Sequence, residues 1–225
     1  MLISVKASQG PVRDQHDRPT CVAFAVTALH EHLHLVRTGL DKTVDLDLSE
    51  EFLYYHCKQR DGLGVKSTGT TISAASGSLA KQGQSLEALC PYQLRPHAPR
   101  SKLTPPAPAA LADGRTRLLS GLTRLPQSLA SVRRSLKAGM PVVAVLDLHS
   151  NAYLTVAGQI ELPRPGDRPI GRHAVLIVEL EDRSGEPCRI FFKNSWGSKW
   201  GDKGFGSLRE DYFKAHGREL WGIPW

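Results

Sequence analysis

The chain has 225 residues, of which 40% are hydrophobic and 23% are charged, and its formal net charge is +7. This composition excludes a disordered or fibrous protein, and the length suffices to bury a substantial core. No apolar run reaches about 18 residues, and the N-terminal stretch MLISVKASQG lacks a signal-peptide core, so we expect no membrane partner.

The distribution of basic residues and of cysteines limits which binding partners and which cellular compartment can be expected. The 29 Lys and Arg residues are scattered along the chain, which favours a solvated basic surface over a nucleic-acid partner. The four cysteines are widely spaced and form no Cys-x-x-Cys pair. A reducing, cytoplasmic location is therefore expected, with a Cys57–Cys90 link left open.

The first predicted helix begins at Cys21. Pro19 stiffens the approach and Thr20 is a suitable N-cap. A thiol in the first turn meets the positive end of the helix dipole, which favours the nucleophilic thiolate. Upstream, Gln15 has a side-chain amide that can donate to an oxyanion beside the Cys21 N–H. The apolar stripe of this helix is Val22, Ala25, Val26, Leu29, Leu33 and Val36.

The same helix contains a His-Glu-x-x-His pattern at His30, Glu31 and His34. In a zinc hydrolase the two histidines would bind the metal and Glu31 would act as base, with Glu50 or Glu51 as the third ligand. We favour an exposed, histidine-rich helix end instead, so neither a metal nor another cofactor is expected.

The central part of the chain alternates helices with loops. Ser49 caps a predicted helix that starts with acidic residues. A glycine-containing loop at 61–71 precedes a predicted helix at 72–82. Five prolines within 96–108 then mark a stiff connector, although a proline-recognising partner is an alternative.

The C-terminal half is predicted to be rich in strands. A helix at 126–138 precedes a buried strand at 141–148, and further strands are expected at 174–180 and 190–192. His173 precedes the second of these strands and Asn194 follows the third. His149, directly after the strand at 141–148, is a competing candidate for a general base. Two further segments, 206–208 and 220–223, complete the sheet.

These motifs resemble the papain family of cysteine peptidases. Gln15, Cys21, His173 and Asn194 occur in the family's order, and Asn194 begins an Asn-Ser-Trp-Gly block. The resemblance implies Cys21 as nucleophile, His173 as base and then acid, Asn194 as the group that orients the imidazole, and Gln15 in the oxyanion hole.

The resemblance also implies substrate contacts. Trp196 would cover the His173–Asn194 contact, and Gly69 and Thr70 would bind the substrate backbone. The sequence departs from the family here, because Thr70 replaces a glycine. It also reads Arg-Pro-Thr-Cys-Val around Cys21, so the usual upstream cysteine and following tryptophan are missing.

We therefore expect a single α+β catalytic domain over 1–225 with two lobes. The helical lobe would span roughly 11–105 and the β-barrel-like lobe roughly 106–225, with the arm 1–10 packed on the latter and an active-site cleft between them. No inhibitory pro-segment is expected before Gln15, so a protein inhibitor or regulatory partner is a possible restraint.

The expected reaction is peptide-bond hydrolysis through an acyl-thioester on Cys21, with peptides or proteins as substrates. Two alternatives keep the fold. An amine instead of water would make the protein a transpeptidase or ligase, and loss of catalysis would leave a peptide-binding module. The zinc hydrolase is the third alternative.

Overall fold

The computed structural model describes residues 1–40, 46–64, 67–94, 103–153 and 155–224. The chain divides into two compact units, which are described separately. The helical unit is Gln15–Thr123, and the β-rich unit combines Met1–Asp14 with Arg124–Trp225. The change between them falls at Thr123–Arg124, later in the chain than the boundary near 105 that the sequence suggested. Most of the proline-rich connector, 95–102, lies outside the described residues.

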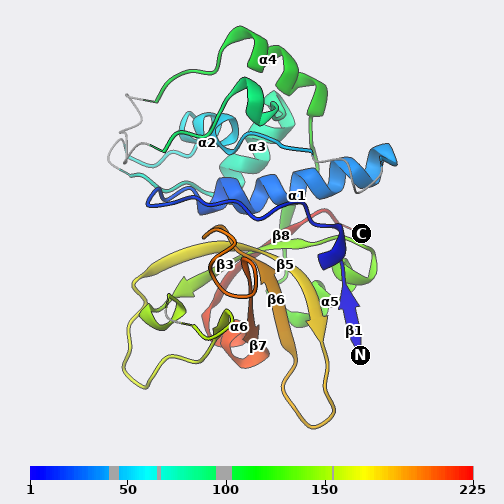
Figure 1. Ribbon diagram of the computed structural model, residues 1–225, viewed down its shortest axis with the longest axis vertical. Coiled ribbons are helices and arrows are strands. Elements are labelled where there is room, and N and C mark those ends of the chain that lie inside the picture. The colour runs from blue at the N-terminus through cyan, green and yellow to red at the C-terminus, as the bar shows by residue number, and fades with distance from the viewer. Residues whose placement is uncertain (41–45, 65–66, 95–102, 154, 225) are drawn as a thin grey trace. The chain divides into compact units, whose positions relative to one another are not determined.

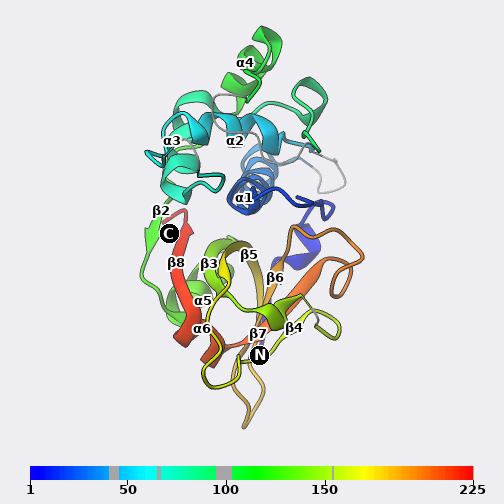
Figure 2. The same cartoon turned by 90° about the vertical axis from the view of Figure 1, so that its left-hand side faces the viewer.

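The helical unit is built on α1. Its side chains Val26, Leu29 and Leu33 are almost completely buried. The helix ends at Thr38 and is followed by Gly39, whose φ of 63° suits glycine. Both α2 and α3 lie between α1 and α4 in Figure 1 and Figure 2. The helices are α1 (Cys21–Thr38), α2 (Glu50–Lys58), α3 (Ile72–Gln82) and α4 (Pro108–Gly114), with short 3-10 turns η2 (Glu87–Leu89) and η4 (Arg115–Arg117).

Side-chain caps fix the starts of two helices. The Ser49 hydroxyl accepts a hydrogen bond from the Phe52 N–H at 3.0 Å, which confirms the predicted cap of α2. The Thr71 hydroxyl accepts one from the Ala74 N–H at 3.1 Å at the start of α3. Each cap satisfies one of the N–H groups that a helix leaves unpaired at its start.

The β-rich unit is organised around one sheet, whose strand order is β2-β8-β3-β5-β6-β7-β4, with β1 also paired to β5. Figure 2 shows these strands curving round one another. Antiparallel pairing joins β3 to β5 and β8, and β6 to β5 and β7, whereas β4 runs parallel to β7. The strands are β1 (Leu2–Ser4), β2 (Thr123–Leu125), β3 (Val142–Leu148), β4 (Gln159–Ile160), β5 (Gly171–Glu181), β6 (Arg189–Lys193), β7 (Phe205–Arg209) and β8 (Gly217–Gly222).

A hydrophobic core packs against this sheet. The helices α5 (Leu129–Lys137) and α6 (Glu210–His216) contribute Val132, Leu136, Tyr212 and Phe213 to it. Its strand residues include Val142, Ala144, Leu146, Val175, Ile177, Ile190, Phe192 and Leu208. The arm expected at 1–10 supplies β1, which pairs with β5 through Ile3 opposite Leu180. The unit also contains the 3-10 turns η1 (Lys6–Ser8) and η5 (Ser150–Ala152).

The four cysteines of the chain form no disulfide within the described structure. Cys57 and Cys188 are buried, whereas Cys21 and Cys90 are partly exposed. The Cys57–Cys90 link that the sequence left open is therefore not formed. Among the described residues, no helix is both long enough and apolar enough to cross a membrane.

Candidate active site

Cys21 is the first residue of α1, as the sequence predicted, and it is partly exposed. An α-helix presents unpaired N–H groups and a partial positive charge at its start. This position therefore favours the thiolate over the thiol, which is the property that a cysteine nucleophile needs.

The turn before Cys21 is held by side-chain hydrogen bonds to Tyr92 and Arg18, and not by the N-cap hydrogen bond that the sequence suggested for Thr20. Thr20 occupies the N-cap position, but its hydroxyl makes no capping bond in the described structure. It lies 2.7 Å from the Tyr92 hydroxyl instead. Tyr92 in turn donates to the Gln15 carbonyl at 2.9 Å, and the Gln15 amide donates to the Arg18 carbonyl at 2.7 Å. One N–H of the Gln15 amide thus fixes the side chain, and an amide N–H is the kind of donor that an oxyanion requires.

Arg18 anchors the turn before Cys21, a role that the sequence analysis did not predict. Its guanidinium forms a two-pronged ion pair with Glu51, and the exposed fractions of the two side chains are only 7% and 9%. It also donates to the Gln93 carbonyl at 2.6 Å and lies over the Tyr92 ring, 4.6 Å from its centroid. Its partner Glu51 lies on α2, 33 positions away in the sequence, so no local sequence signal identified the pair. The Cys21 turn is therefore tied to α2 by a buried charge pair.

The loop that contains Gly69 and Thr70 is anchored by a second buried charge pair. Lys58 lies 2.7 Å from Asp61, with exposed side-chain fractions of 1% and 0%. The Lys58 ammonium also donates to the Gly69 carbonyl at 2.9 Å, and the Thr70 hydroxyl donates to Asp61 at 3.1 Å. The Gly69 carbonyl thus already accepts one hydrogen bond, while both residues stay partly exposed.

His173 and Asn194 meet in the β-rich unit. His173 lies on β5 opposite Leu146 of β3, and Asn194 directly follows β6. His173 Nε2 lies 2.7 Å from Asn194 Oδ1. The same oxygen accepts the Ser195 N–H at 2.8 Å, which identifies it as the carbonyl end of the amide. Nε2 must then carry the proton in neutral His173, so Nδ1 is the basic nitrogen.

Burial shapes the acidity of this imidazole. Desolvation lowers the pKa of His173 to about 4, and the hydrogen bond to Asn194 opposes that shift. A buried imidazolium is stable near neutral pH only beside a negative charge. The arrangement therefore suits an ion pair with a thiolate better than an isolated cation.

Trp196 covers the imidazole with an aromatic stack. Its ring centroid lies 4.7 Å from that of His173, and Tyr153 stacks on it at 4.8 Å with an interplanar angle of 16°. An isolated antiparallel β-bridge pairs the backbone of Trp196 with that of Asp14, and the Gly197 N–H donates to the Arg13 carbonyl at 3.2 Å. Sequence reasoning missed Tyr153, which directly follows the short 3-10 turn η5 and carries no periodic signal.

The histidine-rich part of α1 differs from our expectation of an exposed helix end. His30, Glu31 and His32 are only 2%, 3% and 4% exposed. His30 Nδ1 lies 2.9 Å from the Gln84 amide oxygen, and Glu31 accepts the Leu48 N–H at 3.0 Å. These polar groups are buried because α1 is covered on this side by neighbouring segments of the helical unit. Among the described residues, no group of three or more His, Cys, Asp or Glu side chains could hold a metal ion.

The competing base, His149, is buried after β3 rather than placed beside Asn194. Its Nδ1 lies 3.2 Å from the Tyr212 hydroxyl, and its ring packs against His216 with centroids 4.6 Å apart. The site residues thus fall into two groups. Gln15, Cys21, Gly69 and Thr70 belong to the helical unit, and His173, Asn194 and Trp196 belong to the β-rich unit.

Known structures share this fold. Xylellain, a cysteine protease from Xylella fastidiosa, is 22% identical with a TM-score of 0.85, covering 99% of this chain and 85% of that one. A Carica candamarcensis cysteine protease in complex with E-64 is 23% identical with a TM-score of 0.68, covering 99% and 97%. Both likenesses establish a papain-like α+β fold with a helical part and a sheet-based part.

Sequence comparison then identifies the family. The sequence model of the protein family described as papain family cysteine protease matches residues 4–219. The chain therefore belongs to the papain family of cysteine proteases. Digestive cysteine proteinase 2 of Homarus americanus is 28% identical over 202 residues, which are 89% of this chain and 58% of that protein. Caricain of Carica papaya is 30% identical over 200 residues, covering 88% and 51%. The chain thus spans little more than half the length of these relatives.

Proposed function

We propose that this protein is a cysteine peptidase that hydrolyses peptide bonds through Cys21, His173 and Asn194. The observation that carries the proposal is the 2.7 Å contact between His173 Nε2 and Asn194 Oδ1. It leaves Nδ1 as the base, which is the nitrogen that the reaction must present to a thiol. The position of Cys21 at the start of α1 and the family membership support the same role.

The first half of the reaction forms a thioester. The Cys21 thiol passes its proton to His173 Nδ1, and the thiolate attacks the peptide carbonyl carbon to form a C–S bond. The Cys21 N–H and the Gln15 amide stabilise the negative charge on the carbonyl oxygen. His173 then gives the proton to the amide nitrogen, the C–N bond breaks, and the amine leaves.

The second half releases the acid and restores the thiol. Water gives a proton to His173 Nδ1 while its oxygen attacks the thioester carbon. The C–S bond breaks, the carboxylic acid leaves, and the proton returns to Cys21. Asn194 keeps the imidazole oriented through both halves, and its neutral amide does this without adding a charge.

Substrates are proposed to be peptides or unfolded protein segments. Gly69 and Thr70 would contact the substrate backbone on the N-terminal side of the cleaved bond. Trp196 would lie beside the amine that leaves when the C–N bond breaks. A protein inhibitor or regulatory partner fits such an enzyme. A reducing cytoplasm is the proposed location, because the thiols of the described structure are unbridged. Neither nucleic acid nor membrane is proposed as a partner.

Covalent labelling tests the nucleophile directly. E-64, the compound bound in the Carica candamarcensis structure, is incubated with the protein at pH 7, and the modified peptide is found by mass spectrometry. We expect one adduct on Cys21. Cys57 and Cys188 serve as internal controls, because burial raises the pKa of both thiols to about 12.

Two variants complete the test. Cys21→Ala should abolish turnover of a peptide library without altering the circular dichroism spectrum, and His173→Ala should slow labelling of Cys21 at pH 7. Unchanged turnover in Cys21→Ala would refute the proposal. Slow labelling that His173→Ala leaves unchanged would point to a peptide-binding module, and products joined to an added amine would point to a transpeptidase.

A further inference from the structure

A hollow of about 440 Å³ opens on the β-rich unit among η1, β4, β6 and β7. None of the residues assigned to catalysis lines it. Side chains on β6 alternate between the two faces of the sheet. Ile190 and Phe192 are buried in the core, whereas Arg189 and Phe191 line the hollow and stay partly exposed. The hollow therefore lies on the outer face of the sheet.

The lining has an excess of positive charge. Lys6, Arg183 and Arg189 contribute cations, and Asp202 contributes a carboxylate. Lys6 pairs with Asp202 at 3.4 Å, but the side chain of Asp202 is 63% exposed. Arg183 pairs with Glu181 at 3.0 Å, outside the lining. Exposed pairs of this kind are weak, so both cations remain available to a ligand.

Arg189 differs from Lys6 and Arg183 in forming no ion pair within the described part of the chain. Its guanidinium donates to the neutral Ser207 hydroxyl at 3.2 Å. Within the described structure no carboxylate lies within ion-pair distance of it. Its register partners are Glu181 on β5, which pairs with Arg183 at 3.0 Å, and Arg209 on β7, which pairs with Asp211. Both charged register partners thus already have ion pairs of their own, which leaves the Arg189 guanidinium able to pair with an added carboxylate.

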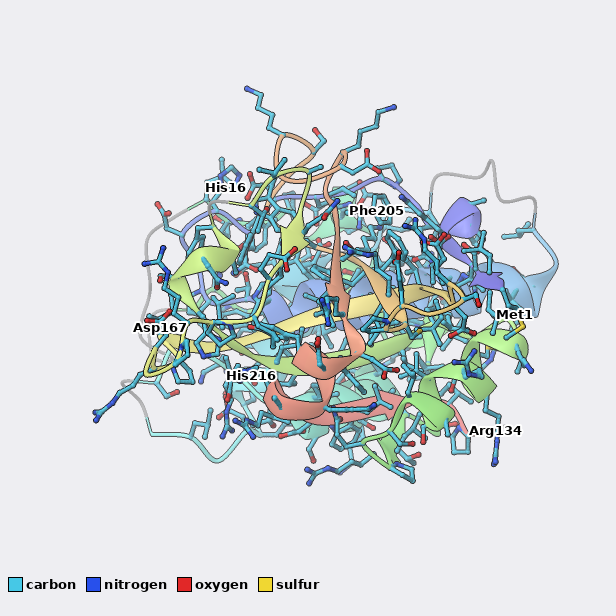
Figure 3. The ribbon with its side chains drawn as sticks, turned by 90° about the horizontal axis from the view of Figure 1, so that it is seen from below. Met1, His16, Arg134, Asp167, Phe205 and His216 are labelled. Carbon is cyan, nitrogen blue, oxygen red and sulfur yellow. The ribbon has the colours of Figure 1, made fainter. Side chains whose placement is uncertain are left out.

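Two aromatic rings complete the hollow. Phe191 of β6 and Phe205 of β7 both line it, and Lys6 Nζ lies 4.7 Å from the centre of the Phe205 ring. Figure 3 labels Phe205 on β7, well apart from His216 at the end of α6. Partly exposed phenyl rings beside cations suit a ligand that joins carboxylates to an apolar side chain.

We propose that this hollow binds acidic peptide segments in which an aromatic or large apolar side chain lies between carboxylates. The carboxylates would pair with Arg189, Arg183 and Lys6, and the apolar side chain would pack on the two phenyl rings. A peptide also offers backbone N–H donors to Asp202. A dense polyanion such as a nucleic acid offers no comparable donors along its phosphates, and Asp202 would repel it. The site adds a recognition surface outside the bond-cleaving residues.

Fluorescence anisotropy with the Cys21→Ala protein tests this, since binding is then read without cleavage. The probe is a fluorescein-labelled Glu-Phe-Glu-Phe-Glu peptide, and the matched probe is Gln-Phe-Gln-Phe-Gln. We expect the acidic probe to bind more tightly, with affinity falling as salt rises. Arg189→Glu should weaken binding of the acidic probe by at least about tenfold.

The control is Lys137→Glu, which makes the same change in net charge at an exposed position of α5. It should change the affinity by less than about twofold. Arg189→Gln replaces Arg189→Glu if the latter does not fold. Equal binding of the two probes, or equal loss with Lys137→Glu, would overturn the proposal. So would displacement of the probe by a short heparin or oligonucleotide at lower concentration than by unlabelled peptide. None of these outcomes bears on whether Cys21 is a nucleophile.

Discussion

The two units hold their candidate site residues by different means. The helical unit fixes the Cys21 turn through buried polar contacts, chiefly the Arg18–Glu51 ion pair and the Thr20–Tyr92–Gln15 hydrogen bonds. The β-rich unit fixes His173 by strand register, by one hydrogen bond and by stacked rings. Single substitutions should therefore lower the stability of the helical unit around Cys21, whereas in the β-rich unit they should disturb the orientation of His173.

The largest effect is expected from Arg18→Met. It leaves the Glu51 carboxylate buried without its partner, and breaking a buried pair in this way costs about 3–5 kcal/mol. Urea unfolding followed by circular dichroism at 222 nm, which reports the helices, would measure it. All four tryptophans lie in the C-terminal part of the chain, so tryptophan fluorescence reports the β-rich unit separately.

The matched control for Arg18 is Arg133→Met. Arg133 pairs with Asp182, but the exposed side-chain fractions are 27% and 32%. Such a pair contributes at most about 1 kcal/mol. Equal losses in the two variants would show that burial is not what distinguishes the two ion pairs.

Acid should destabilise the helical unit through His30. Desolvation lowers the pKa of His30 to about 4, below its ordinary value of 6.5. The unfolded chain therefore takes up the proton first, and stability is lost as the pH falls from about 6.5 to about 4. The loss from this one group is about 3 kcal/mol.

Urea unfolding at several pH values, with His30→Asn as the comparison, measures that contribution. The variant should lose less stability between pH 6.5 and 4 than the wild type, although His56, whose pKa is also lowered to about 4 by burial, still titrates in both. Parallel pH profiles for the two proteins would contradict the assignment.

In the β-rich unit, Asn194→Ala should act on alignment more than on stability. The imidazole loses the hydrogen bond that fixes its orientation, and a misplacement of this kind costs about 10²-fold in kcat. Peptide hydrolysis compared with the KM of the same substrate would show it. A large rise in KM with unchanged kcat would mean that Asn194 serves binding instead.

The smallest effect is expected from Thr20→Val. It removes the hydroxyl that lies 2.7 Å from Tyr92, while the Tyr92 bond to the Gln15 carbonyl remains. The loss should be about 1 kcal/mol in the free energy of unfolding. A change larger than that of Arg18→Met would reverse the ranking of polar contacts in this unit.

Local patterns in the sequence predicted much of the fold. The Ser49 cap, the helix at 72–82 and the strands that frame His173 and Asn194 all follow from neighbouring residues, and the structure has them. The helix α6 was missed, although its acidic first turn and basic last turn carried the signal. The helix α4 was missed because its first residue, Pro108, ended a run of prolines, and proline is favoured at that position.

Contacts between distant segments could not be predicted in this way. Arg18 and Glu51 carry no mutual spacing signal, and nothing local indicates that Tyr153 stacks on Trp196. The burial of His30, Glu31 and His32 was judged wrongly for the same reason, since polar residues on a helix are usually exposed. Cys21 was predicted from its place at a helix start, and Gln15 from its amide upstream of that helix. His173 and Asn194 were assigned their roles because the order of the four residues resembles a family pattern.

The unbridged cysteines have a practical consequence for handling this protein. Dithiothreitol has no disulfide to break among the described residues, so it can be added freely without loosening the fold. Any gain in turnover on its addition would then measure how much of the nucleophile had been oxidised during purification. A single titration with dithiothreitol can thus distinguish activity lost by oxidation of Cys21 from activity lost by unfolding.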